Sequence, residues 1–219
     1  MPTTVVTGAN RGIGLELTRL ARERGDAVAI CRESSRELEA IGARIERGVD
    51  VTRDGDVDAL ASRLSGTPID VLILNAGRLV PDELESVSLE DVREQLEVTA
   101  LGPLRVARAL RGNLRKGSKI AIITSRMGSI ADNTSGGYYG YRASKAALNA
   151  IGVSLAIDLR PAGIAVAMLH PGFVRTGMTG GAGHIDPAES ARGLWARIDA
   201  LALESSGGFW HMNGERLPW

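Results

Sequence analysis

Short apolar runs alternate with amphipathic stretches along the chain, and this alternation is the strongest constraint on its fold. Strands that are apolar along their whole length are buried on both faces, which is typical of a parallel sheet covered by helices on each side. The pattern predicts an α/β chain with a doubly wound parallel sheet of about seven strands. The segments expected to form strands are TTVVT (3–7), AVAIC (27–31), a short run within IERGVDV (45–51), IDVLIL (69–74), KIAIIT (119–124), IAVAML (164–169) and a run around GGFWHM (207–212).

The amphipathic stretches between these runs predict helices on both faces of the sheet. In SLED (88–91), Ser88 and Asp91 have the spacing of a capping box at the start of a long helix that ends at about residue 111. No repeat or linker divides the chain, so we expect one domain over residues 1–219. Further helices are expected over 12–24, within SRELEAIG (35–42), and over 54–65, 139–159 and 187–202.

Composition excludes several classes of function. Lys plus Arg and Asp plus Glu number 26 each, so no global field attracts the chain to nucleic acid or to an anionic membrane. The single cysteine, Cys31, rules out an intrachain disulfide and fits a reducing compartment. The apolar runs are too short to span a bilayer, and no secretory signal is visible. A cytoplasmic protein without a nucleic-acid or membrane partner is therefore expected.

The stretch TGANRGIG (7–14) joins the first strand to the first helix. Gly8, Gly12 and Gly14 allow a tight turn, a close approach of the backbone to a diphosphate, and close packing of helix on sheet. The start of the helix offers free N–H groups and a partial positive charge to the phosphates. A plain turn is the alternative for the glycines alone, but their place in a strand–turn–helix unit predicts a nucleotide-binding Rossmann fold.

Two arginines indicate which nucleotide is bound. In NAD-binding folds a carboxylate near the end of the second strand bonds the ribose 2′-hydroxyl, whereas an arginine accommodates a 2′-phosphate. Here Arg32 follows the second strand, and Arg11 lies in the glycine loop. This favours NADP(H) over NAD(H). The alternative is that both arginines are solvated and that Glu33 supplies the carboxylate.

Three further motifs follow strands, and a fourth lies at the start of a helix: LNAG (74–77), TSRMG (124–128), HPGFVRT (170–176) and YRASK (141–145). Together with the glycine loop, this set resembles the short-chain dehydrogenases/reductases over essentially the whole chain. The segment SRMGSIADNTSGGYYGYRASKAALN and the ending GERLPW are similar to the carbonyl-reductase-like branch that includes the C-factor and sniffer proteins.

The resemblance implies a catalytic set of Ser125, Tyr141 and Lys145. Tyr141 would protonate the substrate carbonyl oxygen, and it is the only tyrosine of the cluster with a lysine four residues later, on the same helix face. Lys145 would favour the phenolate and hold the nicotinamide ribose. Ser125 would stabilise the developing charge on the carbonyl oxygen. For Ser125 the alternative is a helix cap or turn, and Ser129 is a minor competitor.

The resemblance also implies the cofactor site. Asp50 would meet the adenine, the LNAG segment would line its ribose, and the segment after the sixth strand would flank the nicotinamide. Asn75 could instead cap its own segment, and Pro171–Gly172 could be only a turn. The residues expected to bind the cofactor are Gly8, Asn10, Arg11, Gly12, Ile13, Gly14, Arg32, Asp50, Val51, Asn75, Ala76, Gly77, Tyr141, Lys145, Pro171, Gly172, Val174 and Thr176.

One position departs from the family pattern. Many members have asparagine in the long helix before the fifth strand, where it is thought to hold a water that relays protons to the lysine. Here Thr99 occupies that place, in VTALG (98–102). A threonine can bond a water but has no amide that both donates and accepts, so the relay and the turnover rate are in doubt.

The expected function is NADP(H)-dependent interconversion of a carbonyl and an alcohol on a small-molecule substrate. The alternative, supported by Thr99 and by the likeness to C-factor, is an NADP(H)-binding signalling or sensor protein with little turnover. A homodimer or homotetramer is expected. Substrate specificity would come from the loop 177–187 and the segment after Leu79. The three histidines, including His170, show no metal-ligand spacing, so no metal is expected.

Overall fold

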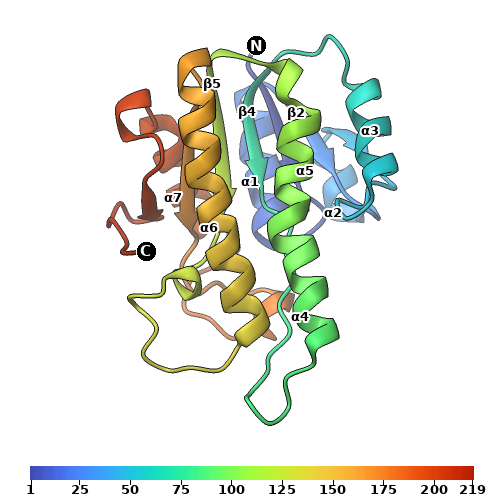
Figure 1. Ribbon diagram of the computed structural model, residues 1–219. Helices are drawn as coiled ribbons and strands as arrows, with labels where there is room; N and C mark the ends of the chain where they lie inside the picture. Colours follow the sequence, from blue (N-terminus) through green and yellow to red (C-terminus); the bar gives the residue numbers. More distant parts are fainter.

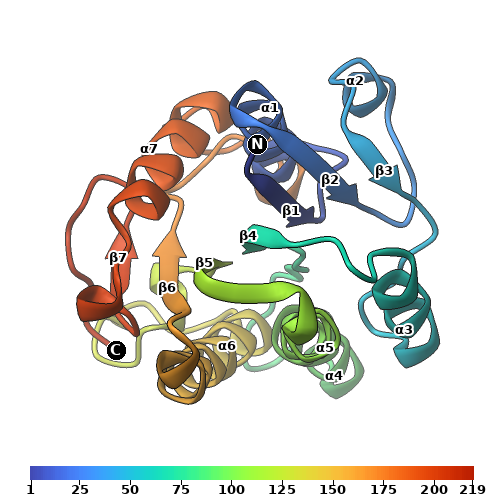
Figure 2. The same cartoon turned by 90° about the horizontal axis from the view of Figure 1, so that it is seen from above.

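Seven parallel strands form one sheet in the order β3-β2-β1-β4-β5-β6-β7 in the computed structural model, which describes residues 1–219 (Figures 1 and 2). The chain winds outward from β1 in one direction, then crosses to β4 and winds outward in the other. This is the predicted doubly wound Rossmann arrangement, with its switch point between β1 and β4. The strands are β1 (Thr3–Thr7), β2 (Asp26–Ile30), β3 (Arg44–Glu46), β4 (Ile69–Leu74), β5 (Leu114–Ile123), β6 (Ala165–His170) and β7 (Phe209–His211).

Helices cover both faces of the sheet. In Figure 2, α1 and α7 lie on one face, and α3, α4, α5 and α6 lie on the other. The helices are α1 (Gly12–Arg24), α2 (Arg36–Glu39), α3 (Asp54–Arg63), α4 (Leu89–Leu96), α5 (Gly102–Ala109), α6 (Tyr139–Leu159) and α7 (Pro187–Ala200). None of the helices is long and apolar enough to cross a membrane.

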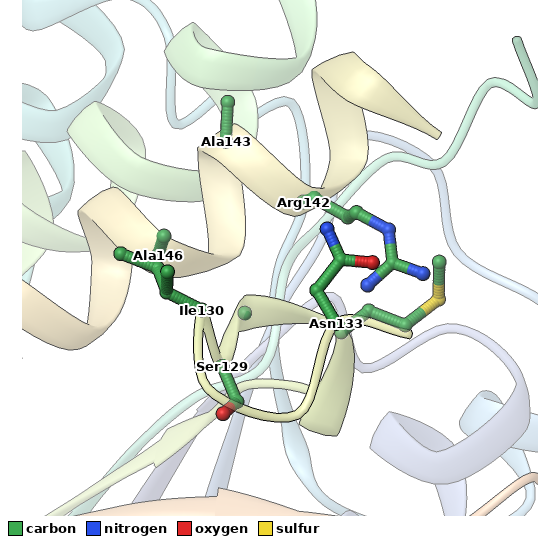
Figure 3. Close-up of a pocket in the computed structure, with 8 residues that line it drawn as sticks. Ser129, Ile130, Asn133, Arg142, Ala143 and Ala146 are labelled. Atoms are coloured by element: carbon green, nitrogen blue, oxygen red, sulfur yellow. The ribbon is translucent and has the colours of Figure 1, made fainter. Parts of the chain in front are cut away.

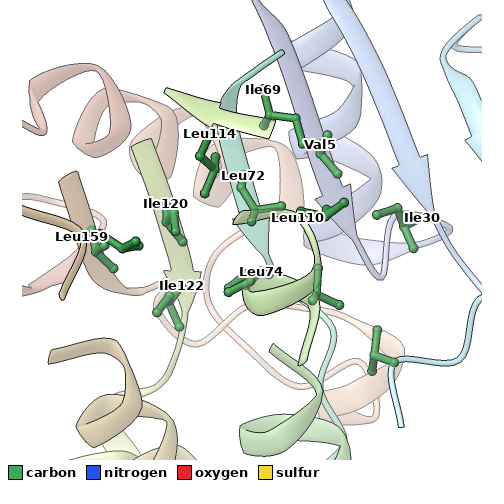
Figure 4. Packing of buried hydrophobic residues seen from close by; sticks show 14 of the residues in the cluster. Val5, Ile30, Ile69, Leu72, Leu74, Leu110, Leu114, Ile120, Ile122 and Leu159 are labelled. Atoms are coloured by element: carbon green, nitrogen blue, oxygen red, sulfur yellow. The ribbon is translucent and has the colours of Figure 1, made fainter. Parts of the chain in front are cut away.

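Alternate residues of the central strands enter two separate cores. Val5 belongs to the core beneath α3–α6, which is shown in Figure 4, and Val6 belongs to the core beneath α1 and α7. On β5, Ile120 belongs to the first of these cores and Ala121 to the second. Each fully buried branched aliphatic side chain contributes about 1.5–3 kcal/mol by leaving water. Burial on both faces therefore explains why the strands read as continuous apolar runs.

The long helix expected from residue 88 to about 111 is divided in two. Ser88 caps its start as predicted, because Ser88 Oγ accepts a hydrogen bond from the Asp91 N–H at 3.3 Å. A π-helical turn, η1 (Glu97–Leu101), then separates α4 from α5. Pro103 lies at the start of α5 and has no N–H to continue the α-helical hydrogen bonds, which gives the break a local cause.

The carboxyl ends of the strands meet at one edge of the sheet, at the lower end of the molecule in Figure 1. The glycine loop, LNAG, TSRMG and HPGFVRT follow β1, β4, β5 and β6 at this edge. The largest difference from the expected strands is that β5 begins at Leu114 instead of 119, and β3 begins at Arg44, one residue before the stretch 45–51. Neither difference moves the carboxyl ends that carry the motifs.

Candidate active site

The glycine loop between β1 and α1 has a conformation that only glycine adopts without strain. Gly8 and Gly12 have φ values of +66° and +57°, in the left-handed region. A Cβ on Gly14 would lie 2.1 Å from the Gly8 carbonyl oxygen, so a side chain there would force the loop apart. No side chain caps α1, and no acidic residue lies in its first turn. The start of α1 is therefore suited to a phosphate.

Asn75, just after β4, holds the glycine loop in place. Its Nδ2 donates hydrogen bonds to the carbonyl oxygens of Thr7 (3.0 Å) and Gly8 (3.2 Å). The backbone N–H groups of Asn75 and Ala76 donate to Thr7 Oγ1 at 2.9 and 3.1 Å. The Asn75 amide thus bonds the loop after β1 and not its own segment. These bonds tie the ends of β1 and β4 together at the switch point.

A cationic region lies after β2. The Arg32 side chain is 75% exposed, and its Nη1 is 4.0 Å from Asp50 Oδ2. Burial of Asp50 opposes its ionisation, but hydrogen bonds from Thr52 and the charge of Arg32 outweigh burial and lower the pKa of the carboxyl. Arg11, at the start of α1, is also exposed, as is Glu33. Arg11 has no carboxylate partner, and Arg32 faces only Asp50, so both exposed guanidinium groups can reach a phosphate group from solvent.

Ser125, Tyr141 and Lys145 come together at the carboxyl end of β5. Ser125 follows that strand, and the other two lie one turn apart on α6. Their exposed fractions are only 7%, 8% and 4%. Lys145 Nζ is 5.7 Å from the centroid of the Tyr141 ring and donates a 2.9 Å hydrogen bond to the carbonyl oxygen of Ile123.

Burial changes the acid–base properties of two of these groups. It raises the pKa of Tyr141 to about 12, although the Ser125 side chain opposes the rise. It lowers the pKa of Lys145 to about 7. Tyr141 is therefore a neutral phenol at pH 7, and Lys145 loses its proton readily. Opposite charges stabilise each other at short range, so a phenolate at Tyr141 would favour the ammonium form of Lys145.

A short 3-10 turn, η3 (Arg126–Gly128), packs Ser125 against α6. Ser125 Oγ accepts a hydrogen bond from the Met127 N–H at 3.2 Å, so Ser125 also has the capping role considered as its alternative. A Cβ on Gly128 would lie 2.8 Å from the Cβ of Lys145. Glycine at the end of the Ser-x-x-Gly pattern therefore lets the turn approach the helix that carries Tyr141.

The serine and the tyrosines considered as alternatives to Ser125 and Tyr141 lie outside the cleft. Ser129 is buried, and its Oγ accepts a hydrogen bond from the Asp132 N–H at 3.1 Å. Tyr138 and Tyr139 are 38% and 42% exposed, in contrast to the buried Tyr141. Neither these tyrosines nor Ser129 line the cleft that contains Ser125 and Tyr141.

Asp82 fixes the start of α6, and the sequence did not single it out. Its Oδ1 accepts a hydrogen bond from the Tyr139 N–H at 2.6 Å, and its Oδ2 accepts one from the Gly140 N–H at 3.3 Å. The Asp82 carbonyl oxygen accepts a third from the Tyr138 N–H at 2.9 Å. The cap comes from a loop 57 residues before Tyr139, so no local spacing could reveal it.

Thr99 lies beside Lys145, with Gly77 between them. Thr99 is fully buried in η1. A Cβ on Gly77 would lie 3.6 Å from Lys145 Nζ and 3.7 Å from Thr99 Oγ1. Thr99 Oγ1 accepts a hydrogen bond from the Arg78 N–H at 3.1 Å. The position where the family has an asparagine is therefore next to the lysine, with its hydroxyl bonded to the backbone.

A cleft of ≈ 370 Å³ lies between the start of α6 and the segments that follow β5 and β6. Tyr141 and Ser125 line it, as do Val174 and Thr176 from the segment after β6. A Cβ on Gly12 would lie 3.4 Å from Thr176 Cγ2, so this segment reaches the glycine loop. The predicted residues in the wall are Ile13, Ser125, Tyr141, Pro171, Gly172, Val174 and Thr176. Wall residues with no role assigned from the sequence include Arg126, Met127, Asp132, Ser135, Arg142 and Phe173.

The other predicted cofactor residues do not line this cleft. They follow the same edge of the sheet toward β2 and β3, except Lys145, which lies buried behind Tyr141. Asn10 is held there by its carbonyl oxygen, which accepts a 2.8 Å hydrogen bond from Ser35 Oγ. The residues in question are Gly8, Asn10, Arg11, Gly12, Gly14, Arg32, Asp50, Val51, Asn75, Ala76, Gly77 and Lys145.

His170 is in the cleft wall but carries no charge. Burial, together with the nearby His211, lowers the pKa of His170 to about 3, so its imidazole is neutral. The two rings are edge-to-face with their centroids 5.0 Å apart. No three His, Cys, Asp or Glu side chains are grouped so that they could hold a metal ion. Burial also raises the pKa of the Cys31 thiol, which disfavours a reactive thiolate.

Comparison with known proteins identifies the family to which this chain is similar. A family model described as short chain dehydrogenase matches residues 2–185. The 1-hydroxy-2-glutathionyl-2-methyl-3-butene dehydrogenase of Rhodococcus sp. strain AD45 is 43% identical over 100% of both chains. The C-signal protein of Myxococcus xanthus is 44% identical over 74% of this chain and 99% of its own.

Solved structures extend the likeness to the whole fold. A Burkholderia multivorans structure with bound NADP, assigned to the short-chain dehydrogenases/reductases, has a TM-score of 0.92 and 33% identity, covering 100% of this chain and 99% of its own. The carbonyl reductase Sniffer of Drosophila melanogaster has a TM-score of 0.90 and 28% identity, covering 100% of both chains.

Proposed function

This chain belongs to the short-chain dehydrogenase family, and we propose that it interconverts a carbonyl and an alcohol with NADP(H), using Ser125, Tyr141 and Lys145. Membership makes the chain an oxidoreductase. The observation that carries the specific proposal is the burial of Tyr141 and Lys145 on one face of α6, beside Ser125 and in reach of the glycine loop.

The cofactor site fits a dinucleotide phosphate. The start of α1 and the glycine loop would hold the diphosphate, and the glycines provide a cradle that a Cβ at Gly14 would fill. Arg11 and Arg32 would bind the 2′-phosphate, which supports NADP(H) over NAD(H). The NADP bound in the similar Burkholderia structure supports the same choice. When bound, NADPH supplies a hydride to the carbonyl carbon.

Residues of the protein supply the proton that the carbonyl oxygen takes up. As the carbonyl carbon is reduced, Tyr141 donates its phenolic proton to the carbonyl oxygen, which becomes the alcohol hydroxyl. Ser125 Oγ donates a hydrogen bond to that oxygen and stabilises the charge that develops on it. Lys145, held by the carbonyl oxygen of Ile123, stabilises the phenolate until solvent returns a proton. In oxidation the phenolate takes the proton from the alcohol.

Replacing Tyr141 by Phe tests the proposal. Tyr141→Phe removes the proton donor and keeps the buried ring, so NADPH oxidation with a panel of aldehydes, ketones and quinones should fall at least about 100-fold. NADPH binding, followed by cofactor fluorescence, should stay within a few-fold of wild type. Because the Rhodococcus relative is named for oxidation of an alcohol, the assay also includes alcohols with NADP⁺. An equally active Tyr141→Phe enzyme would contradict the assigned acid.

The likeness to C-signal supports a second candidate, an NADP(H)-binding signalling or sensor protein with little turnover. Thr99 beside Lys145 also supports it, because the asparagine common in the family is missing from this position. Tight NADPH binding without turnover on any compound of the panel, in either direction, would favour this candidate over the enzyme.

Self-association is part of the proposal. Leu101 at the end of η1, Leu104 on α5 and Ile157 on α6 are 43%, 36% and 65% exposed. Pairing of these helices between copies would cover this apolar surface in a homodimer or homotetramer. Sedimentation equilibrium distinguishes the two states, and a monomer at micromolar concentration would contradict both.

A further inference from the structure

One guanidinium in the cleft wall has no carboxylate partner. The wall carries three charged side chains: Arg126, Asp132 and Arg142. Arg126 is neutralised, because its Nε is 3.3 Å from Asp132 and its Nη2 is 3.0 Å from Glu215. Arg142, the residue after Tyr141, bonds only neutral groups. A partly buried charge without a counter-ion is unfavourable, so this arginine attracts an anion.

Neutral acceptors hold Arg142 in position. Its Nε donates to the Gly137 carbonyl oxygen at 3.1 Å, and its Nη2 donates to Ser135 Oγ at 2.9 Å and to the Gly136 carbonyl oxygen at 3.3 Å. All three acceptors are bonded by Nε and Nη2. The two N–H groups of Nη1 bond no atom of the protein and are free to donate to a ligand.

The loop before Arg142 has three successive residues in the left-handed region. Gly136 and Gly137 have φ values of +65° and +61°, and Tyr138, at +52°, is the only residue other than glycine in the left-handed region. This conformation is unfavourable for an L-residue, and such strain collects at ligand-binding sites. Gly136 and Gly137 adopt this conformation without steric cost and supply two of the acceptors that hold the guanidinium, and the strained Tyr138 follows them directly.

Arg142 also borders a second hollow, shown in Figure 3. This hollow of ≈ 270 Å³ shares Met127 and Arg142 with the cleft that contains Tyr141. Arg142 and Met127 therefore separate the cleft from this second hollow. The sides of the hollow include the apolar residues Ile130, Ala143 and Ala146.

We propose that Arg142 binds a carboxylate of the substrate, so that the preferred substrates are aldehydes, ketones or alcohols that also carry an acidic group. This inference rests on the proposed function, because the reacting carbon must lie at Tyr141. Arginine matches a carboxylate in shape and charge and binds it through charge-assisted hydrogen bonds. Arg142 is a specificity residue and takes no part in the transfer of the proton.

Two probes that differ in one charge test the proposal: 4-carboxybenzaldehyde and its methyl ester. NADPH oxidation is measured with wild type, Arg142→Gln, Arg142→Lys and the control Arg192→Gln, whose arginine is exposed on α7, outside the cleft. Wild type should favour the acid over the ester by about tenfold or more in kcat/KM. Arg142→Gln should lose most of this preference through a higher KM for the acid, Arg142→Lys should retain part, and Arg192→Gln should retain all.

Binding of both probes to the protein–NADPH complex, measured by calorimetry, separates failure of this inference from failure of the proposed function. If neither probe is reduced but the acid binds and Arg142→Gln weakens only the acid, the anion site stands and the redox proposal fails. An unchanged acid-to-ester ratio in Arg142→Gln would show that Arg142 only fastens the loop, and would overturn the inference. Absence of acid binding to wild type would overturn it as well.

Discussion

Lys145 Nζ lies 5.7 Å from the centroid of the Tyr141 ring, and the exposed fractions of the two residues are only 4% and 8%. Without a negative charge nearby, burial favours the neutral form of both groups. The pair is therefore arranged to stabilise a phenolate at the cost of burying a lysine. That cost has a measurable effect on stability.

The first prediction concerns the pH dependence of folding. Between about pH 7 and pH 10 Lys145 is protonated in the unfolded chain but neutral in the folded, cofactor-free protein. The free energy of unfolding therefore decreases as the pH is lowered from 10 to 7, because protons bind to the unfolded chain. Lys145→Met lacks this group. The stability of wild type relative to Lys145→Met should rise by a few kcal/mol from pH 7 to pH 10, in urea unfolding at each pH. A pH-independent difference would show that Lys145 titrates normally.

A second prediction concerns the glycine loop. Gly14→Ala should lower the free energy of unfolding by about 1–3 kcal/mol, because its Cβ meets the Gly8 carbonyl oxygen, and should weaken NADPH binding at least about tenfold. Gly55→Ala is the matched control, since a Cβ at this helical glycine meets no atom within 4 Å. It should stabilise the protein by about 0.5–1 kcal/mol and leave NADPH binding unchanged. Equal effects of the two substitutions would contradict the packing argument.

The choice of cofactor gives a third prediction. Arg32→Gln should lower the ratio of kcat/KM for NADPH over NADH by about tenfold or more, because a charge-assisted bond to the 2′-phosphate is lost. Steady-state kinetics with both cofactors measures the ratio. Arg160→Gln, at an exposed arginine after α6, should leave it unchanged. If Arg32→Gln also leaves it unchanged, Arg32 does not bind the 2′-phosphate.

Thr99 provides a fourth prediction. Thr99→Val keeps the shape of the side chain but removes the acceptor of the Arg78 N–H, which should cost about 0.5–1.5 kcal/mol of stability. Thr99→Ser keeps the hydroxyl and should lose less. Thermal unfolding gives the stabilities, and kcat should fall further in the valine variant than in the serine variant. Equal kcat values would remove the Thr99 hydroxyl from any proton path to Lys145.

Much of the fold could be predicted because its signals are local. Two-sided burial of the strands produces continuous apolar runs, and the strand–turn–helix context identifies the glycine loop. The i, i+4 spacing to Lys145 distinguished Tyr141 from its two neighbours, and only Tyr141 is buried. The apolar runs and the glycine loop predicted the Rossmann topology, and the resemblance of the motifs predicted the family and the oxidoreductase class; all three are confirmed. The roles of the individual site residues remain predictions.

What the sequence did not reveal depends on contacts between distant segments. The Asp82 cap on α6 comes from another loop, and the break at η1 was hidden in a segment with a helical pattern on both sides. Arg142 looked like an ordinary residue of the catalytic helix. Its proposed role depends on which arginines of the cleft have carboxylate partners. That pairing could not be predicted locally, because Glu215, the partner of Arg126, is 89 residues away in the sequence.

The cap by Asp82 has a consequence for redesign of this protein. The loop that borders the cleft at Leu79 also carries the carboxylate that fastens the first turn of α6, only a few residues from Tyr141. A change in the length of that loop would displace the proton donor along with the substrate wall. Altered selectivity and catalytic rate are therefore coupled here, and libraries that vary this loop should keep Asp82 fixed as the anchor on which both depend.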